Sequence, residues 1–199
     1  MAGLQVQNPA RLWQEGGVRN NLQSSERRRK PLRPLDEERL RELAIRYVGR
    51  YATSRHKLGS YLARKLRERG WEDEGTPDID ALVSKMDELG FVDDEIYAGM
   101  KARSLTARGY GVRRVGEALY AAGIEEQDRA AAEEEARAAA FDSARRFARK
   151  RRIGPFAAEA ADPDRRQKQI AAFLRAGHDL RLARLFVESP PGSEPDPYE

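Results

Sequence analysis

Apolar residues recur along most of the chain at spacings of three and four, the pattern of an α-helix with one buried face. The first series places six residues on one helical stripe: Leu40, Leu43, Ala44, Tyr47, Val48 and Tyr51. Asp36 precedes the series, and a short carboxylate there accepts hydrogen bonds from the free N–H groups of the first helical turn. The pattern predicts a helix that begins after Asp36 and turns this stripe to the core.

Two further helices follow with their own start and stop signals. Ser54 can cap the second, and Gly70 suits the left-handed turn that ends it. Pro77 and Asp78 begin the third, which ends at Gly90. Their inner faces hold Leu58, Tyr61, Leu62 and Leu66, and then Leu82, Val83, Met86 and Leu89. These three helices predict one compact module.

The same arrangement recurs twice. In the second unit Ile96, Tyr97 and Met100 open a helix, Val112, Val115 and Leu119 form the next, and an alanine-rich helix spans residues 125–140. In the third, the apolar positions are Phe141, Ala144 and Ala148, then Ile170, Phe173 and Leu174, then Leu182, Leu185 and Phe186.

Three glycines, Gly70, Gly123 and Gly177, lie 53 and 54 residues apart, each four residues after a large apolar side chain. A repeat of this period indicates stacked modules. The alternative is that any helical protein has glycine at helix ends and an apolar residue one turn earlier.

The predicted fold is therefore all-α, an elongated tandem array of three three-helix modules, and no segment alternates strongly enough to predict a strand. We expect modules at residues 36–92, 93–140 and 141–189, the third divergent and carrying an insertion near 153–164. A flexible, disordered basic arm over residues 1–35 contains Arg27, Arg28, Arg29, Lys30 and Arg33, and a proline-rich acidic tail spans residues 190–199.

Composition narrows the function classes. The 199 residues carry 37 Lys and Arg against 33 Asp and Glu, a net charge of +4 that mildly favours an anionic partner. The chain has no cysteine, which excludes disulfides and thiolate chemistry. No apolar stretch is long enough for a membrane span, and the first residues lack the pattern of a secretory signal. A cytoplasmic monomer without a membrane contact is expected.

The adjacent carboxylates Asp93 and Asp94 could be catalytic groups, metal ligands or helix caps. No histidine lies nearby, and no further acid follows at the spacing of a calcium loop, so capping of the next helix is favoured. The chain also lacks a phosphate-binding loop, a zinc-protease motif, a nucleophile elbow and a dinucleotide fingerprint. We expect a protein that is not an enzyme and needs no cofactor, with no catalytic or metal-binding residue.

The stretch Leu89-Gly90-Phe91-Val92-Asp93-Asp94, followed by Tyr97-Ala98, resembles the hallmark of the RecX family of recombinase regulators. The resemblance continues through Arg108-Gly109, Arg113, Val115, Leu119 and Gly123-Ile124, and upstream through Ser54, Leu58, Leu62, Leu66 and Gly70. It covers residues 36–140 well and 141–189 weakly. One departure is Lys57, where the family often has an acidic residue, so a Ser-x-x-Glu capping box is lost.

The resemblance implies tandem three-helix modules that bind the RecA filament on single-stranded DNA. Such proteins restrain the ATPase, strand-exchange and coprotease activities of RecA in DNA repair, recombination and the SOS response. Direct DNA contact is also possible for such a protein. Two alternatives stay open: a DNA-binding protein of the helix-turn-helix type that acts on duplex DNA without RecA, and an adaptor whose basic faces dock only acidic protein.

Basic side chains recur in each module and are the candidates for contact with RecA or nucleic acid. They are Lys57, Arg64 and Arg67; Lys101, Arg103, Arg108, Arg113 and Arg114; and Arg145, Arg149 and Arg152. Tyr110 joins them because an aromatic ring between glycines can stack on a base or can simply fill a turn. For any one of these cations, ordinary solvation of an outer helix face is the competing explanation. His56 and His178 are expected at the surface.

The residues expected to act as structural caps and joints are Ser54, Gly70, Gly90, Asp93, Asp94, Gly123 and Gly177.

Overall fold

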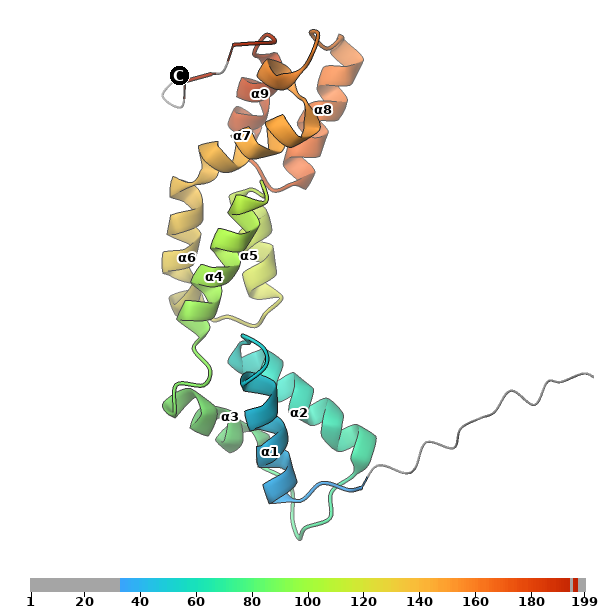
Figure 1. Ribbon diagram of the computed structural model, residues 1–199, viewed down its shortest axis with the longest axis vertical. Helices are drawn as coiled ribbons and strands as arrows, with labels where there is room; N and C mark the ends of the chain where they lie inside the picture. Colours follow the sequence, from blue (N-terminus) through green and yellow to red (C-terminus); the bar gives the residue numbers. More distant parts are fainter. Residues whose placement is uncertain (1–32, 194, 197–199) are drawn as a thin grey trace, which may run out of the picture. The chain divides into compact units, whose positions relative to one another are not determined.

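The computed structural model describes residues 33–193, 195 and 196, and within these ranges it contains helices and no strand (Figure 1). The α-helices are α1 (Glu37–Val48), α2 (Arg55–Arg69), α3 (Ile79–Glu88), α4 (Asp94–Ala107), α5 (Val112–Tyr120), α6 (Glu126–Ala138), α7 (Ala140–Arg151), α8 (Pro163–Arg175) and α9 (Leu180–Glu188). A short 3₁₀-helix, η1 (Gly154–Phe156), lies between α7 and α8. The predicted all-α fold is confirmed.

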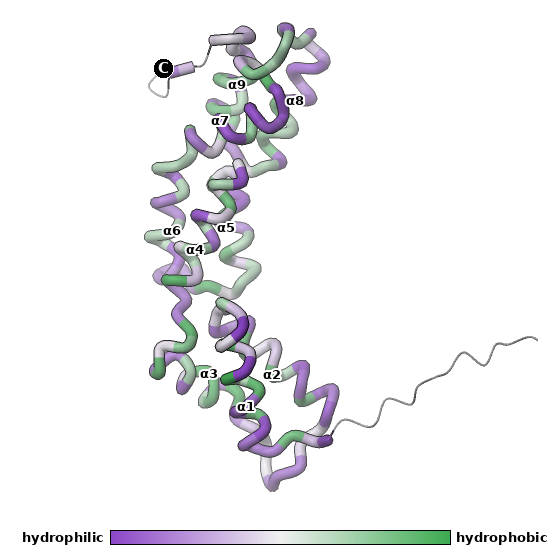
Figure 2. The backbone as a smooth tube through the Cα atoms, viewed as in Figure 1, coloured by the Kyte–Doolittle hydropathy of each residue, from purple (hydrophilic) through white to green (hydrophobic). Residues whose placement is uncertain are grey.

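The helices pack around three apolar clusters that follow one another in the chain. The first is formed by α1, α2 and α3, the second by α4, α5 and α6, and the third by α7, α8 and α9. Figure 2 shows apolar and polar positions alternating along the helices, as amphipathic packing requires. The module boundaries expected at residues 92/93 and 140/141 stay predictions.

The predicted helix starts carry the expected caps. The side chain of Asp36 accepts a hydrogen bond from Arg39 N at 2.8 Å, and Asp78 accepts one from Ala81 N at 2.8 Å. Asp93 does the same for Ile96 N at 2.8 Å. These acceptors satisfy N–H groups that have no partner inside the helix, and each stabilises its helix by about 1 kcal/mol.

The glycines expected at helix ends have left-handed backbone angles. Gly70, Gly90, Gly123 and Gly177 have φ angles of +81°, +71°, +70° and +93°. A side chain rarely adopts this left-handed backbone, so glycine is the residue that ends these helices without strain.

Tyr51 and Leu89, expected on inner faces, are half-exposed instead, and the periodic positions Ile96, Met100 and Leu174 are exposed as well. Tyr51 lies beyond the C-cap of α1 at Gly49, and Leu89 is itself the C-cap of α3. The helical spacing that predicted their burial no longer applies after the helix ends. Phe91 is exposed in the following turn, whereas Val92 is buried.

Both ends of the described chain are more ordered than the sequence suggested. Leu35, assigned to the arm, is fully buried in the first cluster. It pairs with Trp71 in a β-bridge, in which Leu35 N donates to Gly70 O and Leu35 O accepts from Glu72 N. Gly192 of the expected tail donates a hydrogen bond to Pro155 O at 2.9 Å. The basic residues Arg27, Arg28, Arg29 and Lys30 lie outside the described residues.

The stretch expected as an insertion contributes to the core at its beginning. Ile153 is buried in the third cluster, and Gly154 and Pro155 of η1 are buried beside it. A Cβ added at Gly154 would come within 1.7 Å of Phe186 O, so this turn lies directly against α9.

Candidate protein and nucleic-acid interface

The guanidinium group of Arg55, at the start of α2, is held by three carboxylates from three other helices. Its Nε donates to Asp94 Oδ2 at 3.2 Å, and its two terminal nitrogens lie 2.5 Å from Asp128 and 3.7 Å from Asp87. The backbone N–H of Arg55 also donates to Asp94, at 2.8 Å. The Asp94 side chain is 3% exposed and that of Arg55 is 35% exposed, so the carboxylate is buried while the guanidinium group is partly open to water.

The electrostatics of this cluster favour the charged arginine. Burial by itself lowers the pKa of Arg55, but the hydrogen bond from Arg55 to Asp94 and the charges of Asp94, Asp87 and Asp128 outweigh it and raise the pKa. The cluster links α2 and α3 of the first bundle to α4 and α6 of the second. Sequence reasoning treated Asp94 as an alternative cap to Asp93 and gave no role to Arg55.

Other predicted joint residues meet at the same place. Ser54 Oγ donates to Ala122 O at 2.6 Å, so the Ser54 side chain joins two bundles in addition to receiving the N–H of Lys57. A Cβ added at Gly123 would lie 2.3 Å from Cγ of His56, so the turn after α5 packs directly on α2.

Lys57 was predicted to face a partner, but its side chain points into this joint. The Lys57 ammonium donates to the Tyr97 hydroxyl and lies 4.8 Å from the Tyr97 ring centroid. In this chain Lys57, which takes the place of an acidic residue often found in the family, bonds a residue of α4, and its contact with a partner stays a prediction.

A second joint connects the start of α5 with the end of α8 through the backbone. Gly111 N donates to Ala176 O at 2.9 Å, and Arg113 N donates to Gly177 O at 3.2 Å. A Cβ at Gly111 would come within 2.3 Å of the Gly177 carbonyl, so neither chain segment has room for a side chain there. The Arg113 guanidinium also donates to Leu174 O at 2.5 Å.

His178 lies in this second joint, and the expectation that it is a surface residue is wrong. Its ring is buried against Phe147 and Phe173, and its Nε2 donates to Gly109 O at 3.0 Å. Nδ1 has no hydrogen-bond partner among the described residues. Burial lowers the pKa of His178, although the Gly109 hydrogen bond and the charge of Asp179 act in the opposite direction. His56 is exposed, as expected.

Tyr110 is half-buried and packs against the second and third clusters together, with the Arg108 guanidinium 5.5 Å from its ring. Its carbonyl accepts a hydrogen bond from Ser143 Oγ at 2.6 Å. The packing of Tyr110 fits a residue that fills a turn between helices. Its stacking on a base or on a partner side chain stays a prediction.

The remaining candidate cations differ in their exposure and in their partners. Arg64, Arg103 and Arg114 are exposed but form ion pairs with Glu68, Glu135 and Glu117, at 3.7, 3.1 and 3.1 Å. Arg67, Arg108 and Arg152 are exposed, Lys101 and Arg145 are half-buried, and Arg149 lies over the Phe156 ring at 4.9 Å. The structure does not gather all the candidates into one surface.

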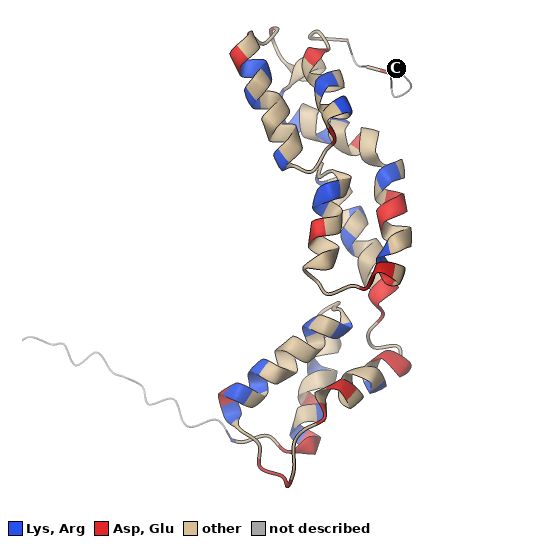
Figure 3. Ribbon diagram, turned by 180° about the vertical axis from the view of Figure 1, so that it is seen from behind, with Lys and Arg blue, Asp and Glu red and all other residues tan. Residues whose placement is uncertain are grey.

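The distribution of charge is a feature that the sequence reasoning missed. Residues 141–189 hold twelve Lys and Arg against six acids, whereas residues 36–140 hold eighteen against twenty-two. In Figure 3 the basic residues follow α2 and α8. A charge count for each module would have found the additional cations: Arg146, Lys150, Arg151, Arg165, Arg166, Lys168, Arg175, Arg181 and Arg184.

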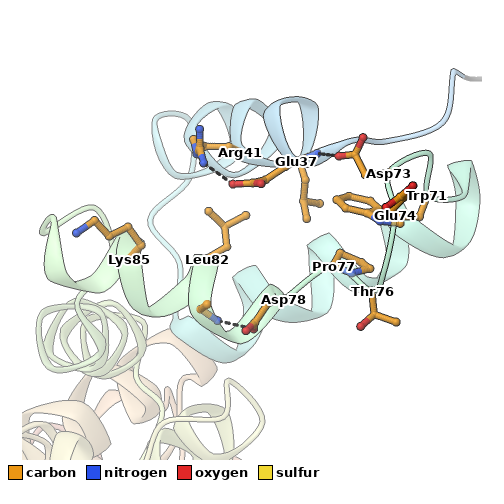
Figure 4. Close-up of a pocket in the computed structure, with 12 residues that line it drawn as sticks. Glu37, Arg41, Trp71, Asp73, Glu74, Thr76, Pro77, Asp78, Leu82 and Lys85 are labelled. Carbon is orange, nitrogen blue, oxygen red and sulfur yellow. Dashed lines mark hydrogen bonds and ion pairs between the residues drawn. The ribbon is translucent and has the colours of Figure 1, made fainter.

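Among the cavities is one of about 440 Å³ on the first bundle (Figure 4). Its lining combines Trp71 and Leu82 with the acids Glu37, Asp73 and Asp78, and the Glu37–Arg41 ion pair of 2.7 Å lies at its edge. Nε1 of Trp71 is buried and finds no hydrogen-bond partner in the described part of the chain.

Within the described ranges, no group of three or more His, Asp or Glu side chains could hold a metal ion. None of the helices described here is both long and apolar enough to cross a membrane.

The chain is similar in sequence to two known regulatory proteins. The chain is 31% identical over 160 residues to the regulatory protein RecX of Myxococcus xanthus, which covers 76% of this chain and 86% of that protein. It is 29% identical over 130 residues to the regulatory protein RecX of Agrobacterium fabrum, covering 63% and 69%. No protein-family model matches the chain.

Two crystal structures share the fold. RecX from Lactobacillus salivarius superposes with a TM-score of 0.57 at 15% identity, over 76% of this chain and 94% of that one. A second regulatory protein RecX gives a TM-score of 0.58 at 18% identity, over 76% and 73%.

Proposed function

The chain belongs to the RecX family of regulatory proteins, and from this premise we propose that it binds the RecA filament on single-stranded DNA and restrains its activities. The activities concerned are ATP hydrolysis, strand exchange and coprotease function, in the control of DNA repair and recombination. Membership of the family is the observation that carries the proposal. We also propose that the protein acts as a cytoplasmic monomer, without enzymatic activity or a cofactor.

The arrangement of the helices supports this function. Three successive clusters give the chain several separate surfaces, and contacts made by linked modules raise the overall affinity without any single strong contact. The two joints hold neighbouring bundles through buried polar contacts, so that binding by one bundle positions the next. A regulator that contacts more than one RecA subunit would need bundles that are held in position relative to their neighbours in this way.

The candidate contact surface is basic and lies mainly on α2 and on residues 141–189. In α2, six Lys or Arg accompany one acid, and in α8 four accompany one. These cations can meet acidic side chains of RecA or phosphates of its DNA. Phosphate contacts release counterions and make binding fall steeply with salt, so a salt titration of filament binding distinguishes the two partners.

The charges weigh against the helix-turn-helix alternative where a third helix would enter the groove, and they leave it open for the basic second helix α2. In such a protein the helix that enters the major groove must approach phosphates. The third helices of the first two bundles are acidic: α3 has three acids and one lysine, and α6 has five acids and two arginines. Phosphates would repel both helices.

The test is the single-stranded-DNA-dependent ATPase of RecA from the same organism, measured with increasing amounts of the full chain. We expect inhibition at or below one molecule per RecA monomer. Arg67→Glu and Lys168→Glu, both in basic helices at exposed positions, should each weaken inhibition several-fold. Unchanged RecA activity in the presence of the wild-type chain contradicts the proposal.

A matched control is Lys85→Glu, which makes the same charge change on the acidic helix α3, where Lys85 is paired with Glu88 at 3.0 Å. This variant should inhibit like the wild type. Sequence-selective binding to duplex DNA in the absence of RecA would instead support the helix-turn-helix alternative.

A further inference from the structure

A cavity of about 410 Å³ on the first bundle is lined by three arginines and three tyrosines and by no acidic residue. Arg46 and Tyr47 lie in the last turn of α1, Arg50 and Tyr51 follow that helix, and Tyr61 and Arg64 come from α2. Sequence reasoning placed all three tyrosines in the hydrophobic stripes of these helices. In the structure their rings form the wall of a surface site.

Two of the rings are stacked, and the third lies beside them at the surface. Tyr47 and Tyr61 are nearly parallel, with centroids 4.1 Å apart and planes inclined by 17°. The Tyr51 ring lies beside Tyr47, with centroids 5.3 Å apart and planes inclined by 51°, and the residue is 50% exposed. Because Tyr51 follows the end of α1, its ring lies beside Tyr47 but is not covered by the core.

The cations around the stack are poorly compensated. Arg50 lies 5.6 Å from the Tyr51 ring centroid, and Arg64 lies 5.7 Å from that of Tyr61. Neither Arg46 nor Arg50 forms an ion pair with any residue in the described part of the chain, and the carboxylate paired with Arg64 is 3.7 Å away.

A second exposed tyrosine shows that this arrangement is not general. Tyr120 is 77% exposed, but the cavity beside it is lined by Glu117 and Glu133 as well as by Arg113 and Arg129. Those acids pair with the arginines, at 2.5 Å for Arg113–Glu117 and 3.1 Å for Arg129–Glu133. An anion would find no uncompensated charge there.

We propose that the Arg46–Tyr51–Arg64 cavity binds an unpaired nucleotide of single-stranded DNA. The base stacks on the exposed ring of Tyr51, and the flanking phosphates pair with the guanidinium groups of Arg46, Arg50 and Arg64. Aromatic rings beside a basic surface are what sequence-tolerant binding of single strands requires, since every base has a flat face. An acidic peptide would use the arginines but leave the stacked rings without a role, and a duplex keeps its bases stacked internally.

This inference is independent of the RecA contact and is tested without RecA. The full chain is titrated into a short fluorescein-labelled oligothymidine, and binding is followed by anisotropy at several salt concentrations. Because stacking on an aromatic side chain contributes about 1–3 kcal/mol per base, Tyr51→Ala should weaken binding about 5- to 160-fold, and Tyr51→Phe should retain it. Arg50→Ala should also lower the salt dependence, since one phosphate contact is lost.

The control variants are Tyr120→Ala, the other exposed tyrosine, and Arg41→Ala, an arginine of α1 that is paired with Glu37. Both should bind the oligonucleotide like the wild type. Thermal unfolding checks that Tyr51→Ala is folded, and Tyr51→Leu, which keeps an apolar side chain without an aromatic ring, tests the ring if the alanine variant is not.

Three outcomes would overturn the inference. The first is wild-type affinity in Tyr51→Ala. The second is equal affinity of the wild-type chain for blunt duplex DNA. The third is binding of labelled polyglutamate with the same sensitivity to Tyr51→Ala, which would assign the cavity to an acidic protein segment.

Discussion

Asp94 accepts hydrogen bonds from both the backbone N–H and the Nε–H of Arg55, at 2.8 and 3.2 Å, and so ties the start of α4 to the start of α2. Its neighbour Asp93 has a different partner, the N–H of Ile96 within α4 itself. The two adjacent carboxylates of the family hallmark therefore have separate functions. One begins a helix, and the other joins two bundles.

Replacement of these two residues one at a time should separate the functions. Asp93→Ala should lower the free energy of unfolding by about 0.5–2 kcal/mol, the usual contribution of an N-cap. Asp94→Ala should cost more, about 1.5–3 kcal/mol per lost charged hydrogen bond, because Arg55 loses its buried partner. Chemical denaturation measures both values. Equal costs would show that Asp94 adds no more than a cap.

Glycine substitutions should have opposite effects at two positions. A Cβ at Gly111 would lie 2.3 Å from the Gly177 carbonyl, so Gly111→Ala should force α5 and the α8 end apart and lower the thermal unfolding temperature. Gly59, inside α2, has its nearest neighbour at 3.8 Å, and Gly59→Ala should stabilise the protein by about 0.5–1 kcal/mol. Destabilisation by Gly59→Ala would contradict the open packing there.

Stability should fall as the pH decreases, because His178 is buried in its neutral form. Its folded-state pKa lies below the usual value of about 6.5, so the contribution is complete above about pH 6.5 and is lost as the pH falls through the folded-state pKa. Thermal unfolding between about pH 7.5 and 5.5 avoids titration of most carboxylates. His178→Gln should flatten this dependence, and the exposed His56→Gln should leave it unchanged. Equal slopes for wild type and His178→Gln would exclude this role.

Leu35 should behave as a core residue although it precedes the first helix. Its side chain is fully buried, and truncation in Leu35→Ala should cost about 2–5 kcal/mol, as for other buried leucines. The matched control is Leu89→Ala, since Leu89 is half-exposed and should change stability by less than about 1 kcal/mol. Denaturant unfolding measures both. Similar values for the two variants would place Leu35 outside the core.

Much of the helical structure follows from interactions between residues that are close in the sequence, and these interactions could be predicted from the sequence. Asp36, Asp78 and Asp93 cap helices because a short carboxylate reaches the first-turn N–H groups within its own segment. Gly70 and Gly123 end helices because the left-handed turn excludes most side chains. Each of these interactions joins residues only a few positions apart, so spacing alone identifies them.

The sequence by itself therefore determined the helices, their caps and the repeated order of three. The tertiary structure alone decided that Lys57 bonds Tyr97, that His178 is buried, that three carboxylates surround Arg55, and that Tyr51 lines an arginine-rich cavity. The physical reason is distance along the chain. Arg55 and Asp128, or Gly109 and His178, are about 70 residues apart and meet only when the bundles pack, and no periodicity in the sequence records that meeting.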